Sequence, residues 1–192
     1  MRVPSVVPSL VFAVGLSVAA PSGAQAVDEI SSLRLKIFFK IMTYDLNLPA
    51  DSGNVRIGVL VPRRDTGTDG YRALRGLFAN YSGTRVKGKP FEIVELAYDR
   101  PQEIPALAAK AGIYSLFVTS SVPASDVAAI VSTANKERLL TFAEAADLVV
   151  LGIDAGVEVI DARPRIVINA GAAKASGRAL DSALIGLARI IH

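Results

Sequence analysis

The sequence predicts an α/β fold: a single domain with a mostly parallel sheet flanked by helices and an antiparallel hairpin in its C-terminal part. Short β-branched runs alternate with stretches of helical period over residues 55–142, which is the pattern of βαβ units. Apolar runs after residue 147 follow one another with short turns, which favours antiparallel pairing. An apolar fraction of 51% and a charged fraction of 20% over 192 residues are typical of one folded domain.

Residues 1–26 predict a signal peptide. Arg2 is the only charge before Asp28, residues 10–20 are largely apolar, and Ala24-Gln25-Ala26 satisfies the small-x-small rule for cleavage. We therefore expect cleavage after Ala26 and export to the periplasm. A single membrane anchor is the less favoured alternative, because a membrane-spanning helix needs about 20 apolar residues.

The mature domain, residues 27–192, lacks the composition of several functional classes. The formal net charge is +3 with scattered Lys and Arg, so no nucleic-acid-binding surface is indicated. There is no Cys, which excludes thiol catalysis, thiolate metal sites and disulfides. The one His is the final residue, His192, where it cannot readily be oriented as the base of a Ser-His pair. We expect no catalytic residue, no metal and no cofactor.

Residues 28–46 predict the first helix, which ends before Pro49. Its apolar side chains recur at intervals of three and four, and Phe38 and Met42 widen the buried face. The favoured interpretation places Phe38, Phe39 and Tyr44 in the core. If this helix presents a second apolar face, Phe39 and Met42 would contact a partner or the second subunit of a dimer. We place the candidate interface at these two residues.

Alternating strands and helices are predicted for the middle of the chain. Their apolar positions follow a period of two in the strands and of 3.6 in the helices. The predicted strands are 55–61, 91–96, 113–118 and 138–142, and the predicted helices are 71–81, 102–110 and 124–135.

Two loops in this region contain residue types that occur in active sites. The loop at 63–70 follows the first strand and holds two Asp, which suggests a metal, but no His is near. A solvated loop in which Thr68 or Asp69 caps the next helix is the favoured interpretation. Ser120 and Ser121 follow the third strand and would need a base, so only a Ser-Lys arrangement stays open as a hydrolase site.

The C-terminal part predicts a hairpin, a strand and a long helix. The hairpin would pair residues 148–153 with 157–160 across the turn Asp154-Ala155-Gly156. Residues 166–168 predict a further strand. Asn169 is a favoured N-cap, and we expect one continuous helix from there to Ile191. Anion binding at its start, next to Gly171, is the alternative, but no phosphate-binding glycine motif is present.

Four segments carry a resemblance to a known family. "RIVINAGAAKASGRALDSALIGLARII" is similar to the C-terminal signature of the YfiR-like family, in which a strand ending in Ile-Asn leads to small residues, Gly and a Leu-rich helix. The matching residues are Ile168-Asn169, Ala172-Ala173, Gly177 and Leu184-Leu187-Ala188. "LKIFFKIMTYDLNLP" resembles the first helix of the family, "VRIGVLV" its first strand, and "RLLTFAEA" a later segment.

This resemblance implies a function that acts by contact. YfiR-like proteins are periplasmic α/β proteins that form homodimers. They bind the periplasmic domain of an inner-membrane diguanylate cyclase and hold it inactive, and an outer-membrane lipoprotein can relieve that inhibition. The sequence departs from the family at three points. Leu48 stands where Trp is usual, "IDARPRIVIN" lacks the family's Phe, and without Cys the disulfide-based control of some relatives cannot operate.

We therefore expect a non-enzymatic periplasmic regulator of cyclic-di-GMP signalling. A small-ligand receptor of the periplasmic-binding type is the second hypothesis, although about 166 mature residues is short for two lobes and a hinge. A hydrolase is third, because His and Cys are missing from the interior of the chain.

Overall fold

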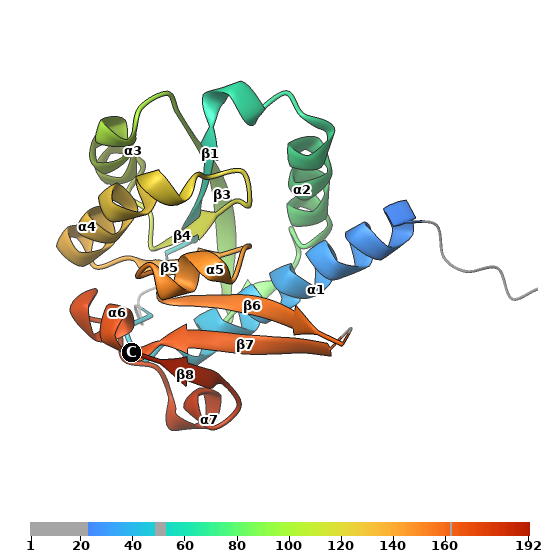
Figure 1. The fold of residues 1–192 in the computed structure, drawn as a ribbon. Helices are drawn as coiled ribbons and strands as arrows, with labels where there is room; N and C mark the ends of the chain where they lie inside the picture. Colours follow the sequence, from blue (N-terminus) through green and yellow to red (C-terminus); the bar gives the residue numbers. More distant parts are fainter. Residues whose placement is uncertain (1–22, 49–52, 162) are drawn as a thin grey trace, which may run out of the picture.

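The computed structural model describes residues 23–48, 53–161 and 163–192 (Figure 1). Residues 1–22 of the predicted signal peptide lie outside these ranges, and the first helix begins at Gly23. No helix in the described part of the chain is both long and apolar enough to span a membrane.

One sheet organises the described residues. Its strands lie in the order β2-β3-β1-β4-β5-β6-β7-β8. Pairing is parallel from β3 through β6 and again between β7 and β8, whereas β2-β3 and β6-β7 are antiparallel. The mostly parallel sheet with a C-terminal antiparallel hairpin is thus confirmed. The strands are β1 Val55–Pro62, β2 Arg85–Val86, β3 Lys89–Tyr98, β4 Ser115–Val118, β5 Leu140–Ala143, β6 Ala155–Ile160, β7 Arg163–Asn169 and β8 Arg189–Ile191.

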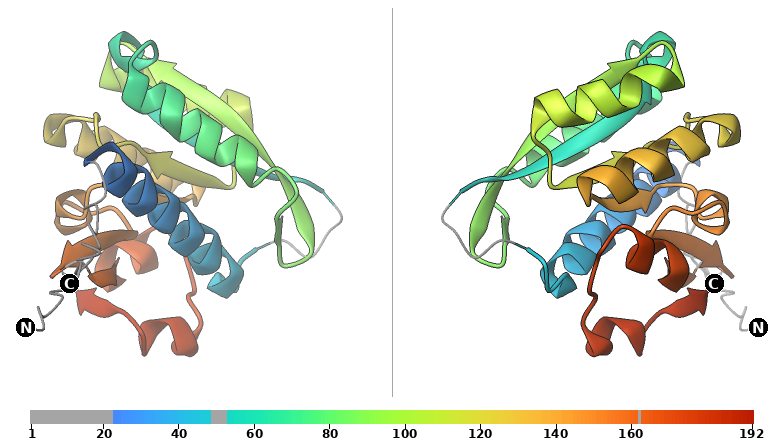
Figure 2. Two further views of the ribbon diagram at one scale, coloured as in Figure 1. Left: turned by 90° about the vertical axis from the view of Figure 1, so that its right-hand side faces the viewer. Right: turned by 90° about the vertical axis from the view of Figure 1, so that its left-hand side faces the viewer.

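Helices cover both faces of the sheet (Figure 2). Helices α1 and α2 pack on one face, and α3, α4 and α5 pack on the other. The helices are α1 Gly23–Tyr44, α2 Asp69–Asn80, α3 Ile104–Ala111, α4 Val127–Glu137, α5 Asp147–Val150, α6 Ala170–Ala175 and α7 Ser182–Ile185. Short 3-10 turns at Arg63–Asp65, Pro101–Glu103 and Ala124–Asp126 precede α2, α3 and α4.

Helix α1 contributes the centre of the larger apolar core. The Phe38 ring centroid lies 5.3 Å from that of Phe117 and 5.2 Å from that of Phe142, so the helix is anchored on β4 and β5. Phe39 and Met42, the candidate interface residues, are buried as well, with 5% and 0% exposure. The reason is that α2 and β3 flank α1. The ring of Phe39 therefore packs against that of Phe91, with 4.8 Å between the ring centroids, instead of facing solvent.

The strand predicted over 148–153 is wrong. Residues 147–150 form helix α5, because Leu148 and Val149 point into the core while Val150 on the next position faces solvent. The predicted turn residues Ala155 and Gly156 instead begin β6. The hairpin is real, but it pairs β6 with β7, and its turn contains Asp161 with a φ of 50°.

The single C-terminal helix is also wrong. Asn169 caps α6 as expected, since its Oδ1 accepts the Ala172 N–H at 2.9 Å. The helix then ends within two turns, where Gly177 takes a φ of 71° and the Arg178 N–H reaches back to the Ala173 carbonyl. The rest of the chain forms α7 and the edge strand β8.

A buried ion pair explains why the chain leaves the helix there. The Arg178 guanidinium donates to Asp45 Oδ2 at 3.2 Å, and the two side chains are 6% and 0% exposed. The same carboxylate accepts a short hydrogen bond from the Tyr114 hydroxyl. A straight helix from residue 169 would have carried Arg178 away from this partner. The C-terminal segment is thereby fixed to the end of α1.

Candidate functional site

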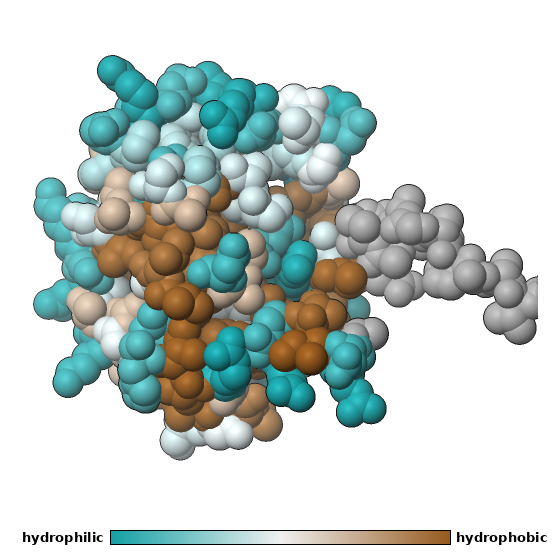
Figure 3. Space-filling view, in the orientation of Figure 1, coloured by the Kyte–Doolittle hydropathy of each residue, from teal (hydrophilic) through white to brown (hydrophobic). Residues whose placement is uncertain are grey.

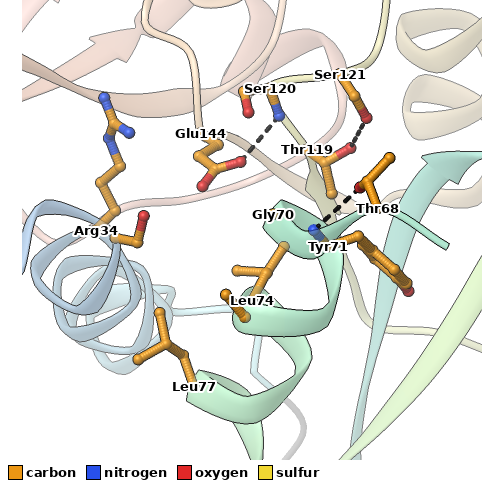
Figure 4. Close-up of a pocket in the computed structure, with 12 residues that line it drawn as sticks. Arg34, Thr68, Gly70, Tyr71, Leu74, Leu77, Thr119, Ser120, Ser121 and Glu144 are labelled. Carbon is orange, nitrogen blue, oxygen red and sulfur yellow. Dashed lines mark hydrogen bonds between the residues drawn. The ribbon is translucent and has the colours of Figure 1, made fainter. Parts of the chain in front are cut away.

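A pocket lies where three parallel strands end. Strands β1, β4 and β5 run side by side and are followed by the loops that start at Arg63, Thr119 and Glu144. The strand order reverses here, because β3 lies on one side of β1 and β4 on the other. A reversal of this kind leaves a crevice at the carboxyl ends of the strands. The pocket has a volume of about 270 Å³ and is closed by α1 and α2 (Figure 4).

The start of helix α2 forms one wall. Thr68 caps the helix, with its Oγ1 accepting the Tyr71 N–H at 3.3 Å, and so decides between the two predicted caps. Gly70 in the first turn lines the pocket. The amides of a first helical turn carry partial positive charge and favour an anion. Tyr71 also lines the pocket, and burial, followed by its hydrogen bond to Glu95, raises the pKa of its hydroxyl above the ordinary value.

Arg34 adds a full positive charge to the pocket. It extends from α1 along the pocket wall, as Figure 4 shows. Its Nε is buried and has no hydrogen-bond partner among the described residues. The side chain as a whole is partly exposed, so its positive charge faces the pocket even though Nε itself is covered. Arg34 is therefore the cation that a bound anion would meet there.

Glu144 places a carboxylate opposite. Its side chain is nearly buried at 8% exposure, and its Oε2 accepts the backbone N–H of Ser120 at 2.9 Å. Its own N–H donates to the Val118 carbonyl at 2.9 Å. The carboxylate is thus held between the ends of β4 and β5. No described cation forms an ion pair with it, so it can accept from a ligand.

The candidate nucleophiles lie in the same pocket, next to Glu144. Ser121 Oγ hydrogen-bonds to Thr119 Oγ1 at 3.0 Å, and Thr119 in turn donates to the Leu60 carbonyl. Ser120 is exposed at the rim. The residues that line the pocket include neither His nor Lys, so the Ser-Lys arrangement left open by the sequence is not assembled here. The titratable group beside them is the Glu144 carboxylate, which accepts the backbone N–H of Ser120; among the described residues none of these hydroxyls donates to it.

The pocket therefore combines three kinds of surface. Arg34 and the start of α2 are positive, Glu144 is negative, and apolar side chains of α2 form the floor. These apolar residues are Ala73, Leu74 and Leu77. A small zwitterion with an apolar substituent fits this chemistry. Sequence reasoning singled out Thr68, Ser120 and Ser121 but gave no role to Arg34 or Glu144. The position of Glu144 directly after a strand was the available signal.

The other predicted sites do not gather ligands. In the loop at 63–70, Asp65 Oδ2 lies 3.7 Å from Arg64 Nε, and Asp69 forms an ion pair with Arg72. Each of the two acids therefore has a neighbouring cation of its own. Within the described residues, no cluster of three or more His, Cys, Asp and Glu is placed to hold a metal. At the start of α6 the Asn169 Nδ2 donates to the Val149 carbonyl at 3.0 Å and its Oδ1 accepts from Ala172, so both ends of the amide are held by the fold.

A band of exposed apolar side chains is visible on one face of the molecule (Figure 3). Figure 3 shows it running over the face that carries α5, β8 and α7. Its members are much more exposed than core residues. They are Val150 at 66%, Leu151 at 50%, Ile185 at 37% and Leu187 at 71% exposure. Exposed apolar side chains gathered on one face are a feature of surfaces that contact other molecules. We refer to these four residues as the apolar band.

Comparison with known proteins identifies relatives by sequence and by fold. A family model described as YfiR/HmsC-like matches residues 31–189. No curated protein matches the chain.

Solved structures resemble the fold at low sequence identity. A conserved domain protein from Vibrio cholerae has a TM-score of 0.62 and 14% identity, with 83% of this chain and 59% of that one covered. An ABC domain in complex with L-Trp from Streptococcus pneumonia has 0.56 and 14%, covering 84% and 60%. A substrate-binding protein with adhesive properties from Clostridium difficile, ligand-free and open, has 0.59 and 15%, covering 82% and 58%. The chain thus spans about three fifths of the length of these structures and shares their α/β fold.

Proposed function

The chain belongs to the YfiR/HmsC-like family of periplasmic regulators, and on that premise we propose that it holds an inner-membrane diguanylate cyclase inactive by binding its periplasmic domain. The family match carries this proposal. It runs from α1 to β8 and so includes the helix, the sheet and the C-terminal segment together. We further propose that the protein acts as a homodimer without catalysis, is exported by its signal peptide, and is released from the cyclase by an outer-membrane lipoprotein.

The proposed mechanism is a shift of population in the cyclase. A binding protein can favour an inactive state only by binding it more tightly than the active one. A tenfold preference corresponds to about 1.4 kcal/mol, which a few buried apolar side chains can supply. The apolar band is the surface that supports this proposal. Its side chains are already exposed, so a partner can cover them without displacing another part of the protein.

Cyclic-di-GMP measurement in a deletion strain tests the function. Deletion of the gene should raise the cyclic-di-GMP level, and return of the unaltered gene should lower that level again. An unchanged level under all envelope conditions contradicts the proposal. Co-purification of a tagged copy from membranes should recover a membrane protein with a cyclase domain.

Substitutions at the surface test whether the apolar band makes the contact. Leu187→Asp and Val150→Asp should fold normally and fail to lower cyclic-di-GMP. Leu46→Asp is the matched control, since Leu46 is 60% exposed at the end of α1, outside the band. If Leu187→Asp and Val150→Asp restore repression as fully as Leu46→Asp does, the contact lies elsewhere.

The pocket supports a second candidate function, a receptor for a small ligand. Arg34 would bind the carboxylate of an amino acid and Glu144 its ammonium group, with Leu74 and Leu77 against the side chain. One structural neighbour was solved with L-Trp, which makes apolar and aromatic amino acids the first compounds to test. The two functions are compatible, because the pocket and the apolar band involve different residues.

Calorimetric titration with amino acids tests the pocket. Binding should require both charged groups of the ligand. The analogue that lacks the carboxylate and the analogue that lacks the amino group should therefore each bind at least tenfold more weakly. Arg34→Ala and Glu144→Gln should abolish binding, whereas Lys36→Ala, an exposed cation on the same helix, should not. Equal binding by Arg34→Ala and the unaltered protein would remove this candidate.

A further inference from the structure

Asp154 is a carboxylate buried at the junction of the sheet's two parts. It precedes β6, the strand that links the parallel part to the C-terminal hairpin, and it is 1% exposed. Its Oδ2 accepts the backbone N–H of Thr141 on β5 at 2.7 Å, and its Oδ1 lies 3.1 Å from the Ser176 hydroxyl at the end of α6. Its backbone N–H donates to Thr141 Oγ1, and its backbone carbonyl accepts from the Asn169 N–H. One residue thus joins β5, β7 and α6.

This carboxylate has no ion-pair partner among the described residues. The charged group that acts on it is Arg178, which is itself bound to Asp45 and acts only at longer range. An ionised group without a contacting cation is expensive to bury. Burial therefore raises the pKa of Asp154 to about 6, and the hydrogen bonds from Thr141 and Ser176 limit that rise.

We propose that Asp154 is a proton-operated lock, which fastens the C-terminal segment more firmly to the sheet when the surroundings become acidic. The proposal does not depend on the identity of any partner or ligand. It concerns a property that matters for a periplasmic protein, whose surroundings follow the pH of the external medium.

The geometry accommodates both protonation states. In the ionised state the Ser176 hydroxyl donates to Asp154 Oδ1. In the protonated state the new O–H at Oδ1 donates to Ser176 Oγ, and the serine proton turns to the Ala173 carbonyl, which lies 3.1 Å from the same hydroxyl. Thr141 N–H donates to Oδ2 throughout. Protonation therefore removes a buried charge and loses no hydrogen bond.

The sign of the pH effect follows from linkage. The pKa is raised from 3.8 in the unfolded chain to about 6 in the folded protein, so the folded state binds the proton more tightly. The added stability is fully present below about pH 3.8 and is lost as the pH rises through about 6. Between pH 7.5 and pH 5 the ratio of folded to unfolded protein should rise about tenfold on account of this group alone.

Asp154→Asn provides the test. The amide can accept from Thr141 and donate to Ser176, so this variant mimics the protonated lock without its pH dependence. Urea unfolding should be measured at pH 7.5 and at pH 5. On acidification the ratio of folded to unfolded protein should rise about tenfold more for the unaltered protein than for Asp154→Asn. Asp161→Asn, an exposed position with a φ of 50° that Asn adopts readily, is the control and should keep the full response.

Carbon-13 NMR of the aspartate carboxyls gives a second measurement, which does not require any variant to fold. One carboxyl should titrate near pH 6, well above the ordinary aspartate range. Hydrogen exchange at the Thr141 amide should slow on acidification, after correction for the intrinsic rate. If all carboxyls titrate near pH 4, or if Asp154→Asn responds to pH as the unaltered protein does, the lock does not exist.

Discussion

At the scale of single residues, the buried polar groups of this protein are joined to segments far apart in the chain. Asp45 accepts from Tyr114 and Arg178, and Asp154 contacts Thr141 and Ser176. A buried charge that loses its partner keeps the cost of its burial, so each of these contacts favours one particular arrangement of the chain. They also lie in places where local sequence patterns predict something else.

Arg178→Met tests the contribution of the buried ion pair. The variant leaves the Asp45 carboxylate without a cation at 0% exposure, and we expect the free energy of unfolding to fall by about 3–5 kcal/mol. Adding Asp45→Asn removes the isolated charge and should recover part of that loss. Urea unfolding measures both. Arg163→Met, at an exposed site, should change stability by less than about 0.5 kcal/mol. A similar small effect at Arg178 would contradict this account.

At the scale of elements, close packing determines where strand β6 begins. Gly156 lies in that strand, and a Cβ there would meet Val149 Cγ2 at 2.7 Å and the Ala143 carbonyl at 3.0 Å. The strand can therefore approach α5 and β5 only because this residue has no side chain.

Two glycine substitutions should have opposite effects. Gly156→Ala should lower the free energy of unfolding by about 1–3 kcal/mol, since the backbone at Ala143 cannot move aside easily. Gly171→Ala should be neutral or stabilising by up to about 1 kcal/mol, because it lies in α6 and its nearest contact would be 3.4 Å away. Thermal unfolding of the two variants decides the matter. Equal destabilisation would show that the close approach of Val149 and Ala143 is not what distinguishes Gly156 from Gly171.

The elements that sequence reasoning predicted correctly are those whose local pattern agrees with their packing. Strand β1 is β-branched and buried, and α2 carries Leu74 and Phe78 on one face. The failures share a cause. Residues 148–151 are apolar throughout, so periodicity did not distinguish a short helix from a strand. Residues 170–191 have helical spacing, but Gly177 and the distant partner Asp45 end the helix. Of the pocket, the sequence indicated the loop residues after the strands, whereas Arg34 required the placement of α1.

At the scale of the whole molecule, the C-terminal segment closes the larger core. Leu184 is fully buried there, and β8 completes the sheet beside β7. Backbone hydrogen bonds from Leu46 to Ala179 and from Asp181 to Tyr44 attach the segment to the end of α1. The segment is therefore part of the folding unit and not an appendage.

Truncation after Ser176 tests this conclusion. Removal of residues 177–192 deletes α7, β8 and the cation that pairs with Asp45, and we expect loss of the cooperative thermal transition. Circular dichroism in the near ultraviolet reports it through Tyr114, whose hydroxyl lies at the same buried pair. Removal of the exposed His192 alone should leave the transition unchanged. A cooperative transition in the longer truncation would show that the segment is dispensable.

The attachment of residues 44–46 to residues 179–181 has a consequence for biogenesis. A polypeptide that crosses the inner membrane amino end first presents α1 long before its partners have emerged. More than 130 residues separate the end of α1 from the C-terminal segment that it binds, so residues 44–46 stay unattached until almost the whole chain has been delivered. Phe38 is covered earlier, by Phe117 and Phe142, so the part that a stalled or shortened chain leaves without its partners is the end of α1 at Asp45.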